Sequence, residues 1–175
     1  MVAATNTPRS QRAEQATALQ TYVEQHRSDL IEAPMLSSLR DEHRHIASVL
    51  ALFSDHINAI ERGDMVNTSV IYEIMDYLVS WPDRHHHPRE DLIYDYVVDV
   101  DDGMRGSRKK LASDHDSMAR NGRDLLQCIE SWRAGYSDGK ELVRLGRDYV
   151  QRSYAHMALE EQEIFPAIDA LLTRD

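Results

Sequence analysis

One stretch decides the fold, residues 154–166, which read Tyr154-Ala-His156-Met-Ala-Leu-Glu160-Glu-Gln-Glu-Ile-Phe165-Pro166. His156 and Glu160 are four residues apart, about one helical turn, so a helix presents both side chains on one face. The same face carries an apolar series, Leu142, Leu145, Tyr149 and Ile164. An unpaired carboxylate on such a face is costly, and a bound cation removes that cost.

The pattern recurs in three earlier helical stretches. His86 and Glu90 form a second pair at the same spacing, in Asp83-Arg-His-His86-His87-Pro-Arg-Glu90-Asp91. His43 and His115 are single histidines in line with the apolar residues of their own helices. Histidines and glutamates on the inward faces of four helices are what a metal site inside a helix bundle requires. The sequence therefore predicts a metal-binding protein.

Apolar residues at three- and four-residue steps predict four consecutive helices, and no alternating strand pattern is found in the sequence. The first helix begins near Pro34 and ends at Gly63. The second follows Asn67, a residue suited to the N-cap. It contains Pro82 and Pro88, and because proline removes a backbone hydrogen bond, we expect a bend or break there.

The third helix is predicted over about residues 107–132, and the fourth over 142–171. Before the fourth helix, Asp138 and Glu141 resemble a capping box. The fold class is therefore all-α, an up-down-up-down four-helix bundle.

The chain divides into two parts. Residues 1–33 are polar and form an N-terminal extension, partly helical, with a short amphipathic helix expected between residues 10 and 30. Residues 34–175 form the four-helix bundle domain.

Composition narrows the classes of partner. The net charge of −10 argues against nucleic acid, because phosphate binding needs clustered Lys and Arg. The longest mostly apolar, uncharged run, residues 46–53, is far shorter than the roughly 20 residues of a membrane span. The single cysteine, Cys128, excludes an internal disulfide and is expected to be a buried, inert thiol. We predict a cytoplasmic protein with no nucleic-acid or membrane partner, and leave the oligomeric state open.

Helical phase separates the site histidines from the others. His45 is two residues after His43, about 200° round the helix, and so points to solvent. His56 shares that outer face, and His26 lies in the extension. His85 has no carboxylate four residues later. These four histidines are therefore placed outside the site.

The ligand types limit the metal. Four imidazoles and two carboxylates, without thiolates, suit iron, manganese or zinc. Six ligands exceed what one tetrahedral zinc takes. Two metal ions bridged by Glu90 and Glu160, with the histidines divided between them, account for the set. A coordination position left open is then available to a small diatomic molecule or peroxide.

These motifs resemble the hemerythrin family, in its bacterial form the HHE cation-binding domain, over residues 35 to about 172. The two His–Glu stretches quoted above are the most specific parts. The resemblance implies two non-haem iron ions with an oxo or hydroxo bridge, with zinc or manganese less expected. It implies that the metal ligands are His43, His86, Glu90, His115, His156 and Glu160.

Two departures from the family's invertebrate oxygen carriers matter. The carriers supply two histidines, four residues apart, from the third helix, whereas Leu111 and Ala119 flank His115 at that spacing here. His87 is a candidate replacement, and its ligation is left open. The fourth helix also carries a glutamate at a four-residue step, where the carriers have an aspartate at five. Both departures fit better the bacterial relatives that resemble sensors, or proteins that handle peroxide or nitric oxide.

The leading functional hypothesis is a di-iron protein that binds O2, or reacts with peroxide or nitric oxide, in oxidative or nitrosative stress. Catalase- or peroxidase-like activity stays open. The alternatives are an iron- or oxygen-responsive regulator, oxygen storage or carriage, and a metal-free structural bundle.

Three neighbours of the predicted site are given structural expectations. Tyr149 is expected to pack in the core. Gly122 either leaves room for a small ligand or allows close helix packing, and Glu163 either contacts a ligand histidine or is solvated.

Overall fold

The computed structural model describes residues 34–172, and every regular element among them is helical. The predicted N-terminal helix and His26 lie outside the described residues. The α-helices are α2 (Pro34–Arg62), α3 (Thr68–Trp81), α4 (His87–Val100), α5 (Arg105–Arg133), α6 (Lys140–Leu159) and α7 (Phe165–Leu172). Three short helical turns join some of them: the π-helical η1 (Pro82–His86) and η3 (Glu160–Ile164), and the 3-10 turn η2 (Asp102–Met104).

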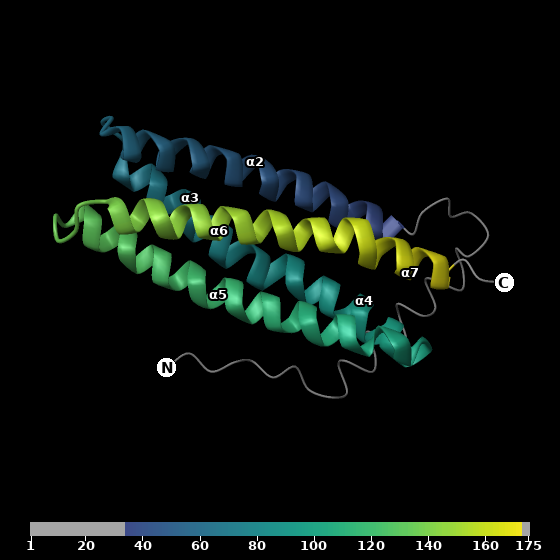
Figure 1. Cartoon of the computed structure of the whole chain (residues 1–175). Helices are drawn as coiled ribbons and strands as arrows, with labels where there is room; N and C mark the ends of the chain where they lie inside the picture. The colour runs from purple at the N-terminus through teal and green to yellow at the C-terminus, as the bar shows by residue number, and fades with distance from the viewer. Residues whose placement is uncertain (1–33, 173–175) are drawn as a thin grey trace.

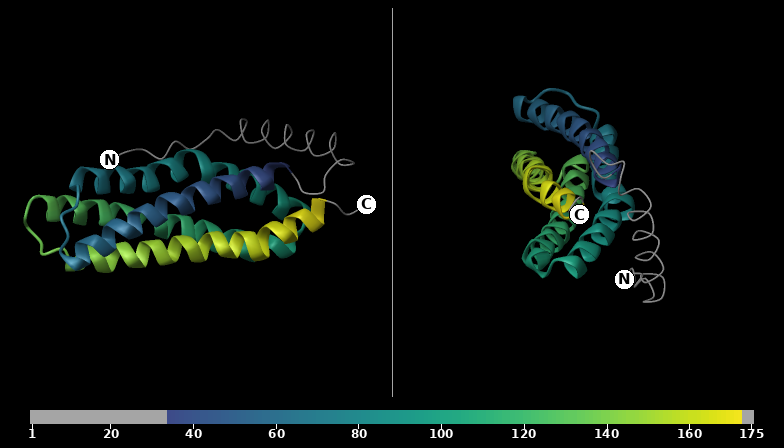
Figure 2. Two further views of the ribbon diagram at one scale, coloured as in Figure 1. Left: turned by 90° about the horizontal axis from the view of Figure 1, so that it is seen from above. Right: turned by 90° about the vertical axis from the view of Figure 1, so that its right-hand side faces the viewer.

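The helices form four rods that run antiparallel to one another (Figure 1). Two of the rods are composite: α3 continues through η1 into α4, and α6 continues through η3 into α7. The rods α2 and α5 each pack against both α3 and α6. Seen along its length and from one end, the domain is a long bundle with a shared interior (Figure 2). The prediction of an all-α four-helix bundle is confirmed.

The helix ends follow local chemistry. The Asn67 side chain accepts hydrogen bonds from two backbone N–H groups, which confirms the predicted N-cap of α3. Gly63, with φ of 77°, ends α2 as expected. The capping-box prediction was wrong in detail: the N-cap of α6 is Gly139, and Glu141 pairs with Arg144.

The apolar core is divided in two. The larger cluster, near the α2–α3 and α5–α6 connections, includes Leu50, Phe53, Met75, Leu125 and Leu142. The smaller cluster, at the opposite end, includes Leu36, Leu39, Val97, Leu111 and Phe165. The buried histidines and glutamates lie between these clusters along each rod. The bundle therefore carries a polar layer across its middle.

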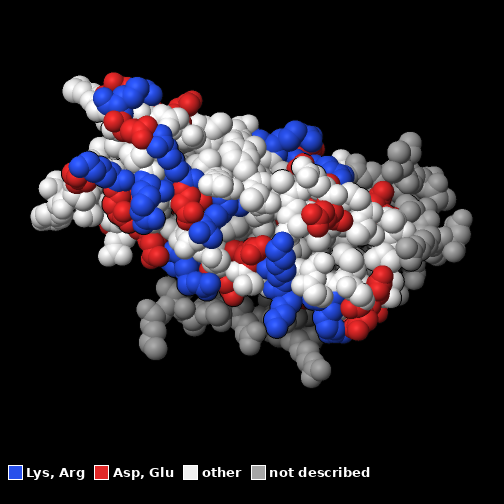
Figure 3. Space-filling model, viewed as in Figure 1, with Lys and Arg blue, Asp and Glu red and all other residues white. Residues whose placement is uncertain are grey.

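The surface shows no segregation of charge on the face drawn in Figure 3, where acidic and basic side chains alternate. Several pair locally, as Arg147 does with Glu61 and Arg152 with Asp148. Among the described helices, none combines the length and apolar character needed to cross a membrane.

Gly122 brings α5 close to α3. A Cβ atom at this position would lie 2.5 Å from Val79 Cγ2 and 3.3 Å from the Tyr149 ring. Of the two expectations for Gly122, the structure therefore favours close helix packing.

We expect Gly122→Ala to destabilise the protein by about 1–3 kcal/mol, because the added methyl overpacks a β-branched neighbour. Gly106→Ala is the matched control in the same helix, since its added Cβ meets no atom within 4 Å. Urea unfolding of both variants tests this, and equal stability of the two would contradict the packing role of Gly122.

Candidate metal centre

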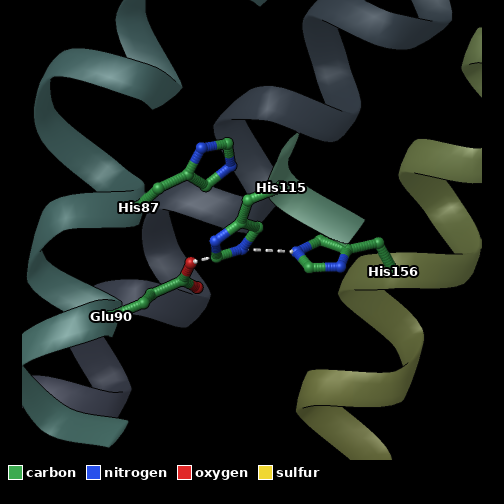
Figure 4. A group of neighbouring side chains, drawn as sticks. All are labelled: His87, Glu90, His115 and His156. Carbon is green, nitrogen blue, oxygen red and sulfur yellow. Dashed lines mark hydrogen bonds and ion pairs between the residues drawn. The ribbon is translucent and has the colours of Figure 1, made fainter. Parts of the chain in front are cut away.

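The structure brings all seven predicted site residues together in the polar layer and buries each of them. Six of them form two groups that share one glutamate: His87, Glu90, His115 and His156 in the first, and His43, His86 and Glu90 in the second. Within a group, one nitrogen or oxygen atom from each residue lies within 4.8 Å of the others. Figure 4 shows the first group, to which α4, α5 and α6 contribute.

Glu90 lies between the two groups. Its Oε1 atom is 3.1 Å from His86 Nε2 and 3.5 Å from His43 Nε2. Its Oε2 atom is 3.4 Å from Nε2 of His115, on the other side. The two oxygens of one carboxylate therefore face different histidines, as a bridging ligand requires.

Glu160 is placed in a similar way from η3. Its Oε2 atom is 3.4 Å from His43 Nε2 and 3.3 Å from His156 Nε2, so it also faces both groups. Its Oε1 atom accepts a hydrogen bond of 2.8 Å from the Tyr94 hydroxyl, a contact that sequence reasoning missed. Tyr94 thereby fixes the orientation of the carboxylate.

Three of the site histidines hold Nδ1 against a carboxylate, and Nε2 of His43 and of His86 faces Glu90. Three pairs have hydrogen-bond geometry: His86 with Glu42 at 2.8 Å, His43 with Glu161 at 2.9 Å, and His87 with Asp83 at 3.1 Å. A carboxylate at Nδ1 keeps the proton there, so the Nε2 lone pair faces inward, and it raises the basicity of the ring. This arrangement is typical of metal-binding histidines.

These outer carboxylates were not predicted. Asp83 is four residues before His87 on the same rod, a spacing that the sequence displays. Glu42 and Glu161 instead reach histidines on other rods, and nothing in the sequence indicates their partners. The predicted alternative, Glu163, is exposed.

Both His–Glu pairs are associated with a π-helical turn. In η1 the His87 N–H donates to the carbonyl of Pro82, and in η3 the Phe165 N–H donates to that of Glu160, both across five residues. Pro88 is two residues after the last residue of η1, and Pro166 is two residues after the last residue of η3. Each proline lacks the N–H that an α-helical hydrogen bond needs. Such single π-turns are frequent at functional sites. The predicted break is therefore a widened turn in a continuous rod.

The π-turn η1 also explains the hydrogen bond of Tyr149 and the inward direction of His87. Since Pro82 has no N–H, the Leu78 carbonyl lacks its usual donor, and the Tyr149 hydroxyl donates to it at 3.2 Å. The smaller rotation per residue in η1 lets His86 and His87 both face inward. His87 stacks on His115 with ring centroids 4.0 Å apart.

The remaining described histidines stay outside the site. His45 and His85 are exposed, and His56 contacts the Leu52 carbonyl of its own helix.

Burial and pairing set the protonation of the site. Burial lowers the pKa of His43, but hydrogen bonds and charge from Glu160 and Glu90 outweigh it and raise the pKa to about 10. His115 follows the same rule, with its pKa raised by Glu90. Burial raises the pKa of Glu90, yet hydrogen bonds from three histidines hold it well below its ordinary range. Without a metal ion, protons on the histidines balance the two carboxylates.

The donor atoms of the site are better satisfied by metal ions than by hydrogen bonds to one another. Four buried atoms face the interior of the site, 3.1–3.5 Å from their neighbours, and have no partner with regular hydrogen-bond geometry among the described residues: His43 Nε2, both carboxylate oxygens of Glu90, and Glu160 Oε2. Leaving such atoms unpaired is expensive, and cations at this position satisfy all four. Nitrogen and oxygen donors without sulfur suit iron, manganese or zinc.

A narrow, mainly apolar cavity borders the site. Its lining includes His86, His87 and His156 together with apolar residues such as Leu50, Val79 and Met118. Ala119, one of the two residues that flank His115 at the four-residue spacing of the carriers' histidines, is also in the lining. Small apolar molecules therefore have space directly beside three site histidines.

Comparison with known proteins identifies the domain. The sequence model of the Hemerythrin HHE cation binding domain matches residues 35–168, which is most of the chain. No curated protein and no solved structure matches the chain closely enough to add to this.

The stability of the metal-free protein is expected to depend on pH through His43. Its pKa is about 6.5 when unfolded and about 10 when folded, so its contribution is fully present below pH 6.5 and is lost as pH rises toward 10. As the pH rises from 6.5 toward 10, the melting temperature of wild type should therefore fall more than that of His43→Gln. A constant difference between the two metal-free proteins would contradict the pairing.

Loss of an outer carboxylate should weaken metal binding without removing a ligand. We expect Glu42→Gln to lower metal affinity about 10–100-fold, because His86 Nδ1 loses a charged acceptor. Glu163→Gln, at an exposed position, is the control. Competition with a chromogenic chelator measures both, and equal affinities would show that Glu42 has no such role.

Proposed function

The chain belongs to the Hemerythrin HHE cation-binding domain family, and we propose that it holds two non-haem iron ions that bind O2 or react with peroxide or nitric oxide. The observation that carries this proposal is the placement of Glu90 and Glu160, each of which faces histidines of both groups. A pair of metal ions explains that placement, whereas a single ion would leave the side of each glutamate that faces the other group without a partner. Iron among the metals that suit these donors is supported by the family.

The chain's own residues have distinct tasks in this proposal. His87, His115 and His156 would hold one ion and His43 and His86 the other, with Glu90 and Glu160 within reach of both. The outer carboxylates hold the imidazoles in position, and Tyr94 holds Glu160. Iron, when bound, supplies electrons and a coordination position for a small oxidant.

The apolar cavity supports small, weakly polar ligands. Its lining combines His86, His87 and His156 with mostly apolar residues, and Asp83 is its acidic member. A mainly apolar wall favours uncharged molecules. O2, nitric oxide and neutral hydrogen peroxide have this character.

A second candidate function is an iron-responsive regulator. It is favoured by the position of the site between the two apolar clusters, because metal loss leaves unpaired groups where the two halves of the core meet. Metal binding then stabilises the folded bundle. A melting temperature that does not change with iron would exclude this regulator.

The deciding experiment is metal content with the optical spectrum of protein from iron-supplemented cells, before and after peroxide, O2 or nitric oxide. We expect about two irons per chain and near-ultraviolet charge-transfer bands that change with at least one reagent. His156→Ala should lose iron and these bands, while His56→Ala, outside the site, should retain both. Circular dichroism establishes that each variant is helical. Wild type that contains zinc or no metal, with no difference from His156→Ala, would overturn the proposal.

A further inference from the structure

A row of aromatic rings connects the site to the surface. Trp81, at the end of α3, stacks on His86 with ring centroids 6.3 Å apart and an interplanar angle of 22°. Trp81 also stacks on Tyr77, with ring centroids 5.8 Å apart and an interplanar angle of 18°. Tyr77 and Trp81 are one helical turn apart, and His86 is the last residue of the π-turn. Three roughly parallel rings therefore extend outward from the metal centre.

The inner end of this row is a site residue. His86 Nε2 lies 3.1 Å from Glu90 Oε1, at the group formed with His43. The ring of Trp81 thus contacts an imidazole that faces the metal position. Trp132 is the other tryptophan of the chain, and it packs near the far end of the larger apolar cluster.

The outer end of the row is accessible. Tyr77 and Trp81 are only half-buried, and the exposed His45 forms a hydrogen bond of 2.9 Å between its Nε2 atom and the Tyr77 hydroxyl. The exposed ring of His85 lies 5.9 Å from that of Trp81. Together these rings form an aromatic surface on which a planar molecule can stack. Tyr94 is nearer to the glutamates, but it is 3% exposed and so cannot meet a reductant.

We propose that Tyr77 and Trp81 carry single electrons from the surface to the metal centre, and that a small phenol is oxidised at Tyr77 while the centre reduces hydrogen peroxide. This proposal rests on the proposed iron function. The stacked rings supply a continuous route through the shell of protein that separates the centre from solvent. The mainly apolar cavity beside His86, His87 and His156 suits peroxide, whereas the rings of Tyr77 and Trp81 offer a phenol a separate contact at the surface.

The reaction balances without a further reagent. Peroxide takes two electrons and two protons at the centre and leaves as two water molecules. Each electron comes from Tyr77 through Trp81, and the phenolic proton of the half-buried Tyr77 is released to solvent. A phenol from solution then returns one electron to the tyrosyl radical, which takes up a proton from solvent. The phenol releases its own proton to solvent, so that two phenols and one peroxide give two phenoxyl radicals and two waters.

The test is to locate the radical. Iron-loaded protein is treated with hydrogen peroxide, freeze-quenched for electron paramagnetic resonance, and in parallel trapped with a nitroso spin trap for peptide mass spectrometry. We expect a tyrosyl signal and a covalent adduct at Tyr77 in wild type. Both should be lost in Tyr77→Phe and in Trp81→Phe, because the second variant interrupts the route but keeps the phenol.

Matched controls separate this route from general oxidation. Trp132→Phe removes the other tryptophan, and Tyr136→Phe removes a tyrosine that is 85% exposed in a connection remote from the site. Both variants should keep the Tyr77 adduct. An undiminished adduct in Trp81→Phe, or an adduct that forms mainly at Tyr136 in wild type, would overturn the proposal.

Iron content and charge-transfer absorption are measured on the same samples. If wild type contains no iron and shows no charge-transfer absorption, both the proposed function and this inference are wrong. Two irons and peroxide consumption without a Tyr77 radical would overturn the electron route alone. Oxidation of guaiacol in steady state should fall in Tyr77→Phe and Trp81→Phe while peroxide-induced spectral changes persist.

Discussion

The burial of two carboxylates, Glu90 and Glu160, is the constraint on which the rest of the structure depends. Both side chains are fully buried, in a layer between two apolar clusters. An ionised carboxylate in such a place is tolerated only when it is paired. The surrounding imidazoles supply that pairing, as protons on His43 and His115 or as ligands to shared cations. The site is therefore a requirement for folding this bundle as well as a place for chemistry.

The two π-turns show how a regular bundle accommodates this layer. Each turn is followed by a proline that removes a donor from the α-helical ladder, so the helix widens where the His–Glu pair has to face inward. Another proline, Pro82 at the start of η1, frees the carbonyl of Leu78, which accepts a hydrogen bond from the Tyr149 hydroxyl of α6. A defect in one helix is thus compensated by a hydrogen bond between helices, which ties the geometry of the site to the packing of the bundle.

The sequence predicted the rods and the inward residues because both depend on short, regular spacings. The helix bounds near Pro34, Gly63 and Asn67 follow from end residues whose chemistry is local. The outer carboxylates were missed since Glu42 and Glu161 act across rods, where the relative rotation of helices decides the contact. His87 stayed undecided for a related reason: its direction depends on the width of η1, which helical phase arithmetic does not include.

The position of His87 bears on the main departure from the oxygen carriers. Those proteins supply two histidines from the third helix, four residues apart, whereas Leu111 and Ala119 flank His115 at that spacing here. His87 lies against His115, so the second rod brings a third imidazole to the group that contains His115 and His156. The small side chain of Ala119 lines the cavity beside these imidazoles. An imidazole from the second rod thus lies in the group that lacks a second histidine from the third helix. Because the cavity adjoins His87 and His156, it favours an exchangeable small ligand at this side of the centre.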